Sequence, residues 1–411
     1  MTFLKIAFRN VLKNRRRSAI TTLAIAFGFM AVCMFKGYTH QAYEKMATAA
    51  IFVEVPGHLV VTKKGFFQEG RIFPEEYLFR KEEVDALRAA LGRVEEVVWV
   101  AQKLELTGLV SNGDVSTIFF ADALDPRKER ELWTHYRYRR WMSRDLLPAD
   151  RGDAVFVGPD LMDLLRLREQ DNVVLMATTQ YGQMNAADAT VWGAFPTFLD
   201  ALNDKYVKMP LSLAQSLYDT DGCDRLCVLC DDPASIPRVR TAIGRAAREL
   251  GLDLEIRPWD EMSVYYGKAK GYLDVVFLFL FSITALIVVM GTVNTMSMAV
   301  YERTREIGTL RAIGLKAGGV LRIFSLEGAI LGTFGSVLGV LLTVLGKLAV
   351  AAADIRYNPP GVAESVAVEV DILPGVLLGS FAVFVLLSVV SAALPARRAA
   401  RANIVDALGH I

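Results

Sequence analysis

The stretch AVYERTREIGTLRAIGLKAGGVLRIF, residues 299–324, decides the fold of this 411-residue chain, because it is rich in charge yet stands between two strongly apolar stretches. Glu302 with Arg305 and Arg303 with Glu306 are opposite charges three positions apart, a spacing that stabilises a helix. Apolar residues recur at helical intervals between these charges, at Val300, Ile307, Leu310, Ile313 and Val320. The pattern predicts a short helix outside the bilayer, between two membrane-spanning helices.

Glycines interrupt the same segment, among them Gly308 and Gly314. Glycine costs about 1 kcal/mol relative to alanine inside a helix, so these glycines indicate that the chain bends or that another protein approaches closely. An ordinary inner loop would also explain the arginines. It would not explain the paired glutamates or the apolar stripe, and we therefore expect a docking surface.

Four apolar stretches are predicted to cross a membrane, in a chain that is 53% hydrophobic and 22% charged. A bilayer is crossed by about 20 largely apolar helical residues. The predicted spans are residues 18–38, 272–300, 323–353 and 372–394. The first follows a basic run, as a secretory signal would, but its apolar core is longer than the usual stretch of about 7–15 residues. It is predicted to be an uncleaved membrane helix.

Basic residues set the predicted orientation, because lysine and arginine near the ends of membrane helices stay in the cytoplasm. They cluster before the first span, between the second and third, and after the fourth, whereas the connection 354–371 is mainly acidic. The segments 1–17, 301–322 and 395–411 are therefore predicted to be cytoplasmic, with both termini inside. Residues 1–17 have the pattern of an amphipathic helix in the headgroup layer, and a basic tail without fixed structure is the alternative.

The long region between the first two spans, residues 39–271, reads as an extracytoplasmic α+β domain. EEVDALRAALGRV has the apolar spacing of a helix, and strand patterns follow it. RLCVLCDDPASIPRVRTAIGRAARELGLDLEIRPW reads as strand, turn, helix and strand. These two halves echo each other around a β-rich middle, which predicts porter-like βαβ units with an insertion at about 150–205. The expected fold class is an α-helical integral membrane protein with four transmembrane helices and this large domain.

Motifs for chemistry are missing from the sequence. A phosphate loop needs Gly-Lys followed by serine or threonine, but Gly267-Lys268 and Gly346-Lys347 are followed by alanine and leucine. The four histidines are scattered, no HExxH or GxSxG occurs, and the net charge is only +1. The aromatic and basic run at 130–145 is interpreted as a solvated or docking loop. We predict no catalytic residue, no metal site and no nucleic-acid partner.

Three cysteines lie in GCDRLCVLC, at Cys223, Cys227 and Cys230. Unpaired structural thiols, a disulfide involving Cys223 and a metal site are all possible interpretations of this spacing. Strand alternation places Cys227 and Cys230 on opposite faces. The redox state of the three thiols is left open.

The third span carries glycines at G-x-x-x-G spacing, which lets membrane helices approach closely. They are Gly328, Gly332, Gly335 and Gly339. Glu327 and Lys347 lie near the ends of the same span, where their side chains are expected to reach the membrane interface. No row of charges lines a pore.

The stretch NTMSMAVYERTREIGTLRAIGLKAGGVLRIFSLEGAILGTFGSVLGV, residues 294–340, resembles the hallmark segment of the MacB/FtsX-like permeases of ABC transporters. FLKIAFRNVLKNRRRSAITTLAIAFGF and LPARRAARANIVDAL resemble the two ends of that family. GPDLMDLLRLREQDNVVLMATTQYGQMNAADATVWGAF and the following DKYVKMPLSLAQSLYD look like the outer domain of its lipoprotein-releasing LolC/LolE branch.

The resemblance implies a permease without a nucleotide site of its own, which works as a dimer with two copies of a separate ABC ATPase that binds ATP and magnesium. It implies that residues 301–316 form the coupling helix, seated in a groove of that ATPase. The expected coupling residues are Glu302, Arg303, Arg305, Glu306, Gly308, Leu310, Arg311 and Gly314.

The resemblance also implies mechanotransmission in the bacterial inner membrane, where ATP-driven motion inside moves the periplasmic domain. The expected partners are a second permease copy or a paralogue, membrane lipids, a lipoprotein or lipid substrate and a periplasmic carrier. Lipoprotein release is the first hypothesis. Export of a drug, peptide or other lipid with an outer-membrane partner, and non-transporting control of a periplasmic enzyme, are the alternatives. The sequence names neither the substrate nor the second permease.

Overall fold

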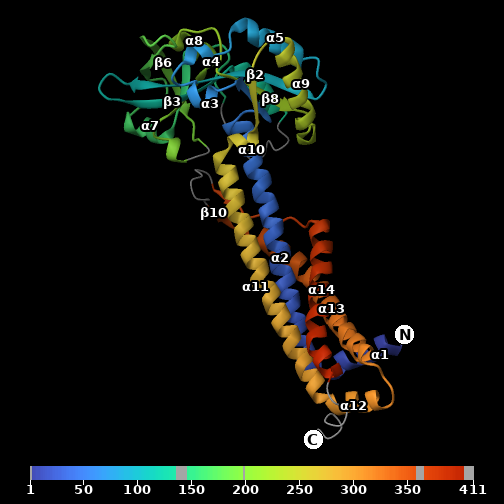
Figure 1. Ribbon diagram of the computed structural model, residues 1–411. Helices are drawn as coiled ribbons and strands as arrows, with labels where there is room; N and C mark the ends of the chain where they lie inside the picture. The colour runs from blue at the N-terminus through green and yellow to red at the C-terminus, as the bar shows by residue number, and fades with distance from the viewer. Residues whose placement is uncertain (1, 136–145, 198–199, 358–364, 402–411) are drawn as a thin grey trace. The chain divides into compact units, whose positions relative to one another are not determined.

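The computed structural model describes residues 2–135, 146–197, 200–357 and 365–401 (Figure 1). The chain divides into two compact units, each described here by itself. The helical unit comprises Met1–Glu44, Ala269–Tyr357 and Ala367–Ile411, and the αβ unit comprises Lys45–Lys268 and Asn358–Val366. The predicted soluble domain, 39–271, therefore has nearly the bounds of the main part of the αβ unit.

In the described part of the chain, four helices are long and apolar enough to cross a membrane. They are α2 (Arg15–Ala49), α11 (Val264–Glu302), α13 (Ala317–Ala353) and α14 (Pro374–Arg401). Helix α2 runs past the predicted end of the first span, and α11 begins before the predicted start of the second. The difference arises because hydropathy marks only the apolar part of a helix, whereas backbone hydrogen bonds continue through polar residues.

Shorter elements complete the helical unit. The amphipathic pattern of the first residues forms α1 (Thr2–Lys13), and α12 (Thr304–Ala312) lies in the charged segment between α11 and α13. Along the chain, two short strands lie between α13 and α14: β10 (Arg356–Tyr357), and β11 (Val366–Ala367), whose first residue is assigned to the αβ unit. Of the predicted tail 395–411, residues 402–411 lie outside the described part.

The core of the helical unit is formed where α2, α11, α13 and α14 meet. Phe29 and Phe384 are fully buried, and their rings meet edge to face with centroids 5.7 Å apart. Other members of the core are Ile25, Val32, Val288, Met296, Leu331 and Ala392. Large apolar residues elsewhere on these helices are exposed, as expected for surfaces that face lipid or another membrane chain.

One half of the αβ unit is a four-stranded antiparallel sheet in the order β2-β8-β1-β9. Its strands are β1 (Leu59–Lys63), β2 (Val97–Ser111), β8 (Arg225–Cys230) and β9 (Leu254–Pro258), and its helices are α5 (Lys81–Leu91) and α9 (Ile236–Glu249). Each helix connects two strands between which a third is inserted, so both connections are split βαβ units. This confirms the porter-like units predicted from the sequence.

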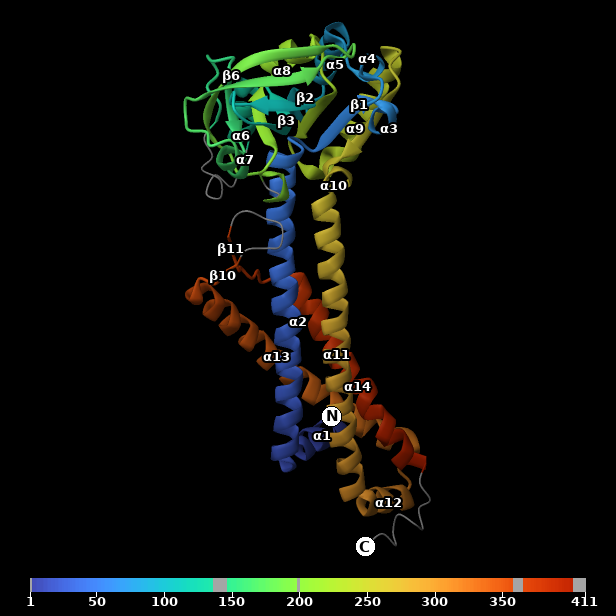
Figure 2. The same ribbon diagram turned by 90° about the vertical axis from the view of Figure 1, so that its left-hand side faces the viewer.

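The other half is a closed ring of strands in the order β2-β3-β7-β4-β6-β5 and back to β2. Strands β2, β3 and β6 of this ring are labelled in Figure 2. The strands are β3 (Ser116–Leu124), β4 (Ala154–Val157), β5 (Asn172–Thr178), β6 (Met184–Ala194) and β7 (Tyr206–Pro210). Small and branched residues fill the interior, as in small barrels generally. Three helices follow strands of the ring along the chain: α6 (Pro126–Thr134) follows β3, α7 (Pro159–Leu164) follows β4, and α8 (Leu211–Tyr218) follows β7.

The β-rich part is larger than the predicted insertion at about 150–205. The second half of β2 pairs with both β3 and β5, so residues before 150 also belong to the ring. The sequence pattern missed this because one long strand serves both halves, and a shared strand has no boundary signal of its own. The remaining elements are η1 (Ala50–Glu54), α3 (Phe66–Glu69), α4 (Pro74–Tyr77), η2 (Asp200–Leu202), η3 (Pro233–Ser235) and α10 (Trp259–Met262).

Candidate functional site: the charged segment between two membrane helices

Helix α12 is set off from its neighbours by a bend at each end. Arg303 leaves the helical region, with φ −114° and ψ 15°, and separates α11 from α12. At the other end Gly314 has φ +108°, and the amide of Leu315 donates to the carbonyl of Leu310. A positive φ strains any residue with a Cβ, which explains a glycine at this position.

The predicted coupling residues fall into two groups by burial. Arg303 and Gly308 are buried, and Arg311 is half-buried. The exposed members are Glu302, Arg305, Glu306, Leu310 and Gly314. The predicted apolar stripe divides in the same way, because Ile307 is buried whereas Ile313 is 80% exposed. One face of α12 therefore packs on the helical unit, and the other presents both charge and exposed apolar side chains.

Arg303 is joined to two other helices by a buried polar cluster. Its Nη1 lies 3.0 Å from Oε1 of Glu327 on α13, and its Nη2 donates to the carbonyl of Asn10 on α1 over 3.4 Å. The side-chain amide of Asn10 donates to the same Oε1 over 2.6 Å. Glu327 is only 2% exposed. The start of α12 is thus tied to both α1 and α13.

This cluster corrects one sequence-based expectation. Glu327 does not extend to an interface but is buried against a cation, because a charge inside a packed structure is tolerated when it is paired and hydrogen-bonded. Arg303 is buried and bonded to α1 and α13, and its role in coupling stays a prediction. No pattern in the sequence indicated the pair, since its members are 24 positions apart and Asn10 is 317 positions from Glu327.

Glu302 makes a second, exposed contact with the N-terminal helices. Its Oε1 lies 2.6 Å from Nη1 of Arg17, and its Oε2 lies 3.5 Å from the amide nitrogen of Asn14. The sequence predicted local pairing with Arg305 instead. That pairing needs one continuous helix, and the chain bends at Arg303, between the two.

The four glycines of α13 that the sequence predicted to pack closely lie against two neighbouring helices. A Cβ on Gly328 would be 2.6 Å from Cβ of Ala392, and one on Gly332 would be 2.9 Å from Cβ of Ser388, both on α14. On the other side, Gly335 and Gly339 face Ile25 and Phe29 of α2 at 2.6 and 2.7 Å. Contacts below 3 Å leave no room for a methyl group, so α13 is held between α2 and α14 at glycine-only distances.

Gly335→Val is expected to destabilise the helical unit by about 1–3 kcal/mol, because the added side chain must displace α2. The measurement is the thermal unfolding of the purified chain in detergent. Gly291→Val is the matched control, since a Cβ there meets nothing within 4 Å. Equal unfolding temperatures for the two variants would show that the packing is looser than described.

A buried ionic network lies where β2, β3 and β8 meet in the αβ unit. Lys103 Nζ lies 3.1 Å from Glu105 and 2.9 Å from Asp122. Arg225 reaches Glu105 over 2.8 Å and binds both oxygens of Asp224. Burial alone would raise the pKa of Glu105, but the two cations lower it to about 2. The charges therefore compensate one another at the junction of the two halves. No sequence motif predicted this network.

The cysteines of the αβ unit are buried free thiols. Cys223 and Cys230 belong to the core under α5 and α9, whereas Cys227 packs with Trp99 and Leu229 on the other face. The predicted alternation is confirmed, and of the three alternatives the structure agrees with unpaired structural thiols.

Cys227 and Cys230 are expected to resist alkylation at pH 8, because burial raises their pKa values to about 12 and about 11 and only the thiolate reacts. Iodoacetamide should label them at least about 100-fold more slowly in the folded chain than in urea, as measured by mass spectrometry. Between an unfolded-state pKa near 9 and these higher values, only the unfolded chain loses protons. Stability should therefore fall as the pH rises above about 9. Rapid labelling of the folded chain would contradict the burial.

Comparison with known families covers most of the chain. Residues 18–246 match the MacB-like periplasmic core domain, and residues 278–404 match the C-terminal part of FtsX-like permeases. The first match spans α2 and nearly the whole αβ unit. The second contains α12 and the buried Arg303–Glu327 pair.

Individual related proteins extend the match. An uncharacterized ABC transporter permease of Methanocaldococcus jannaschii is 23% identical over 420 residues, which cover 98% of this chain and 97% of that protein. The macrolide export ATP-binding/permease protein MacB of Chromobacterium violaceum is 30% identical over 215 residues, which cover 51% of this chain and 31% of that protein. The chain thus spans about a third of the MacB relative. The solved periplasmic region of MacB from Actinobacillus actinomycetemcomitans aligns with 51% of this chain and 91% of its own, with a TM-score of 0.37 and 11% identity.

The two family matches together contain α13 and α14, most of α2, α11 and the αβ unit, and the charged segment with the buried Arg303–Glu327 pair. The chain belongs to the family of FtsX-like permeases with a MacB-like periplasmic core domain and is an ABC transporter permease of the MacB/FtsX type.

Proposed function

We propose that this permease couples ATP hydrolysis by a separate ABC ATPase to conformational work of its extracytoplasmic αβ unit. The observation that carries the proposal is α12, a helix with an exposed charged face. The residue that precedes it, Arg303, is tied to α1 and α13 by the Arg303–Glu327–Asn10 cluster. A helix anchored in this way moves together with the membrane helices rather than independently of them.

The exposed face of α12 is the proposed contact with the ATPase. Arg305 and Glu306 offer charges of both signs, and Leu310 adds an exposed apolar side chain. Mixed charge around an apolar centre is typical of protein interfaces. In this proposal α12 and both termini are cytoplasmic, in agreement with the basic residues beside them. ATP and magnesium bind to the ATPase, two copies of which act on a permease dimer.

The cargo is the finer part of the proposal. The resemblance of the middle domain to the LolC/LolE branch supports lipoprotein release from the inner membrane. The MacB relative, which is named for macrolide export, supports export of a small molecule. Both activities need the same motion of an outer domain driven from inside, so the choice between them does not alter the role of α12.

The test is purification of the full chain from its native membrane, followed by identification of the proteins and small molecules that accompany it. We expect an ABC ATPase in equal amount to the permease, with a hydrolysis rate that rises at least severalfold when the permease is present. A bound acylated protein would support lipoprotein release, and a bound small molecule would support export. Absence of any ATPase, under conditions that preserve other membrane complexes, would contradict the proposal.

A further inference from the structure

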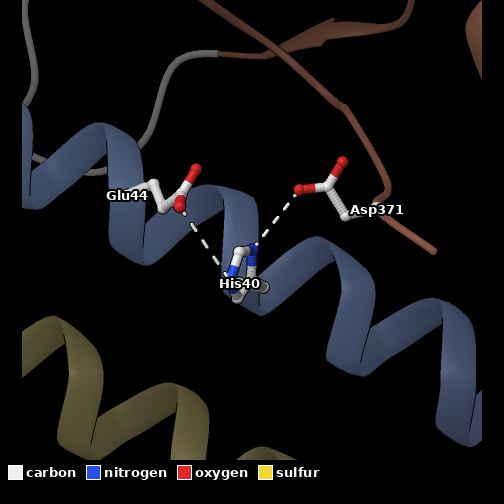
Figure 3. Close-up of side chains that lie close together, drawn as sticks. All are labelled: His40, Glu44 and Asp371. Atoms are coloured by element: carbon white, nitrogen blue, oxygen red, sulfur yellow. Dashed lines mark hydrogen bonds and ion pairs between the residues drawn. The ribbon is translucent and has the colours of Figure 1, made fainter. Parts of the chain in front are cut away.

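His40, Glu44 and Asp371 lie close together in the helical unit, as Figure 3 shows. His40 and Glu44 are one turn apart on α2, and Asp371 comes from the segment before α14, 331 positions further along the chain. Nδ1 of His40 lies 3.3 Å from Oδ2 of Asp371, and Nε2 lies 4.0 Å from Oε1 of Glu44. One ligand atom from each residue lies within 4.8 Å of the other two.

The backbone around Asp371 is fitted to α2. Its amide donates to the carbonyl of Gly37 over 3.3 Å, and a Cβ on Gly37 would collide with the carbonyl oxygen of Asp371. The side-chain amide of Gln41 donates to Oδ2 of Asp371 over 2.8 Å. Val370, the preceding residue, is buried. Asp371 is therefore held over the helix by its backbone, its carboxylate and its neighbour, rather than meeting His40 by chance.

The three side chains form a ligand set for a divalent metal. Imidazole nitrogen and carboxylate oxygen bind Zn²⁺ at about 2.0–2.2 Å, so two ligands of one ion lie at most about 4 Å apart. Nδ1 of His40 and Oδ2 of Asp371, 3.3 Å apart, are within that limit. With one ligand atom from each residue, all three atoms lie within 4.8 Å of one another, so rotation of the exposed side chains must bring them closer by less than about 1 Å. A histidine and a second ligand four positions apart on one helix face are also the arrangement used in helical zinc motifs.

Access and support are both present. The side chains of His40, Glu44 and Asp371 are 40%, 51% and 31% exposed, so an ion can enter from solvent. Gln41 orients the carboxylate of Asp371 from outside the ligand set, as residues that support metal ligands commonly do. The sequence predicted no metal site, because the histidines were scattered and Asp371 is remote from α2 along the chain.

We propose that His40, Glu44 and Asp371 bind one divalent transition-metal ion, best matched by Zn²⁺, with water completing the coordination. The bound ion links the connection between α13 and α14 to α2. Without an ion, the same groups form a hydrogen-bonded clasp, and the experiment distinguishes these two states.

The experiment uses the full chain in detergent, without a polyhistidine tag and stripped of metal. Zn²⁺ binding is measured by calorimetry, and Co²⁺ is used as a coloured probe of coordination. We expect one ion per chain, a visible Co²⁺ spectrum without the thiolate-to-metal band that cysteine ligands give, and a higher unfolding temperature with Zn²⁺. His40→Ala and Asp371→Asn should each weaken binding at least about 100-fold. Asp354→Asn, which removes an exposed carboxylate from the same connection, should bind as the unaltered chain does.

The unfolding temperature of each variant, measured without metal, shows whether that variant is folded. Glu44→Gln keeps a hydrogen-bonding side chain at its position, so it should fold normally and lose the stabilisation by Zn²⁺. The proposal is overturned if the stripped chain takes up no ion, or if His40→Ala and Asp371→Asn bind Zn²⁺ as tightly as Asp354→Asn. A strong thiolate band would assign the binding to the cysteines and would also overturn it.

Discussion

Glu327→Leu is expected to destabilise the helical unit by about 3–5 kcal/mol, because it leaves the guanidinium of Arg303 buried without its anion. Arg303→Leu should destabilise the unit by a similar amount, because it leaves the carboxylate of Glu327 buried without its cation. The measurement is unfolding of the purified chain in detergent with increasing denaturant. Stability close to that of the unaltered chain for either single variant would show that the pair is not buried.

The double variant Arg303→Leu/Glu327→Leu separates folding from coupling. Replacing both members of a buried ion pair by apolar residues is often neutral for stability, so the double variant should recover most of what each single variant loses. If the pair transmits motion from α12 to α13, ATP-dependent work should remain impaired although stability has returned. Full recovery of ATP-dependent work would give the pair a purely structural role.

The exposed pair Arg17–Glu302 supplies the matched comparison. Its side chains are 43% and 39% exposed, and exposed ion pairs contribute about 0–1 kcal/mol. Glu302→Leu should therefore change stability by less than about 1 kcal/mol. A large loss there would mean that the charges near α12 act on folding in general rather than through the buried cluster.

Charge reversal at Arg305→Glu with Glu306→Arg is expected to abolish coupling while leaving the fold intact. Both side chains are exposed, and surface substitutions usually change stability by less than about 0.5 kcal/mol. Placing like charges against the partner should reduce ATPase binding and permease-stimulated hydrolysis at least tenfold. The measurement is co-purification of the ATPase together with its hydrolysis rate in the complex.

The matched control is the same reversal on a helix of the αβ unit. Arg248→Glu with Glu249→Arg exchanges two adjacent exposed charges on α9, so, like the α12 reversal, it leaves the net charge and composition unchanged. It should leave both ATPase readouts unchanged. If the α12 reversal also leaves them unchanged, α12 is not the coupling surface.

Local patterns predicted much of the architecture. The four apolar stretches correspond to α2, α11, α13 and α14, because about 20 apolar residues in succession favour a membrane helix whatever the rest of the chain does. The split βαβ units followed from strand and helix periodicities of 2 and 3.6 residues. The alternation that set Cys227 and Cys230 on opposite faces is of the same local kind.

Contacts between distant segments had no such signal. The long strand β2 belongs to two halves of the αβ unit, and this became visible only in its pairing with β8, β3 and β5. The carbonyl of Gly37 accepts from the amide of Asp371, and the missing side chain of Gly37 leaves room for the backbone of Asp371. In the sequence, Gly37 is one glycine in a helical segment, and nothing near it indicates this contact.

The sequence by itself determined which segments cross the membrane, which segment carries charge between them, and where glycine allows close packing, because each of these depends on neighbouring residues alone. Only the tertiary structure decided that Arg303 faces Glu327 and Asn10 rather than a partner, and that His40 and Glu44 meet Asp371. The physical reason is that burial and pairing of a charge depend on which helices pack together. That packing is the outcome of the whole fold and not of any single stretch.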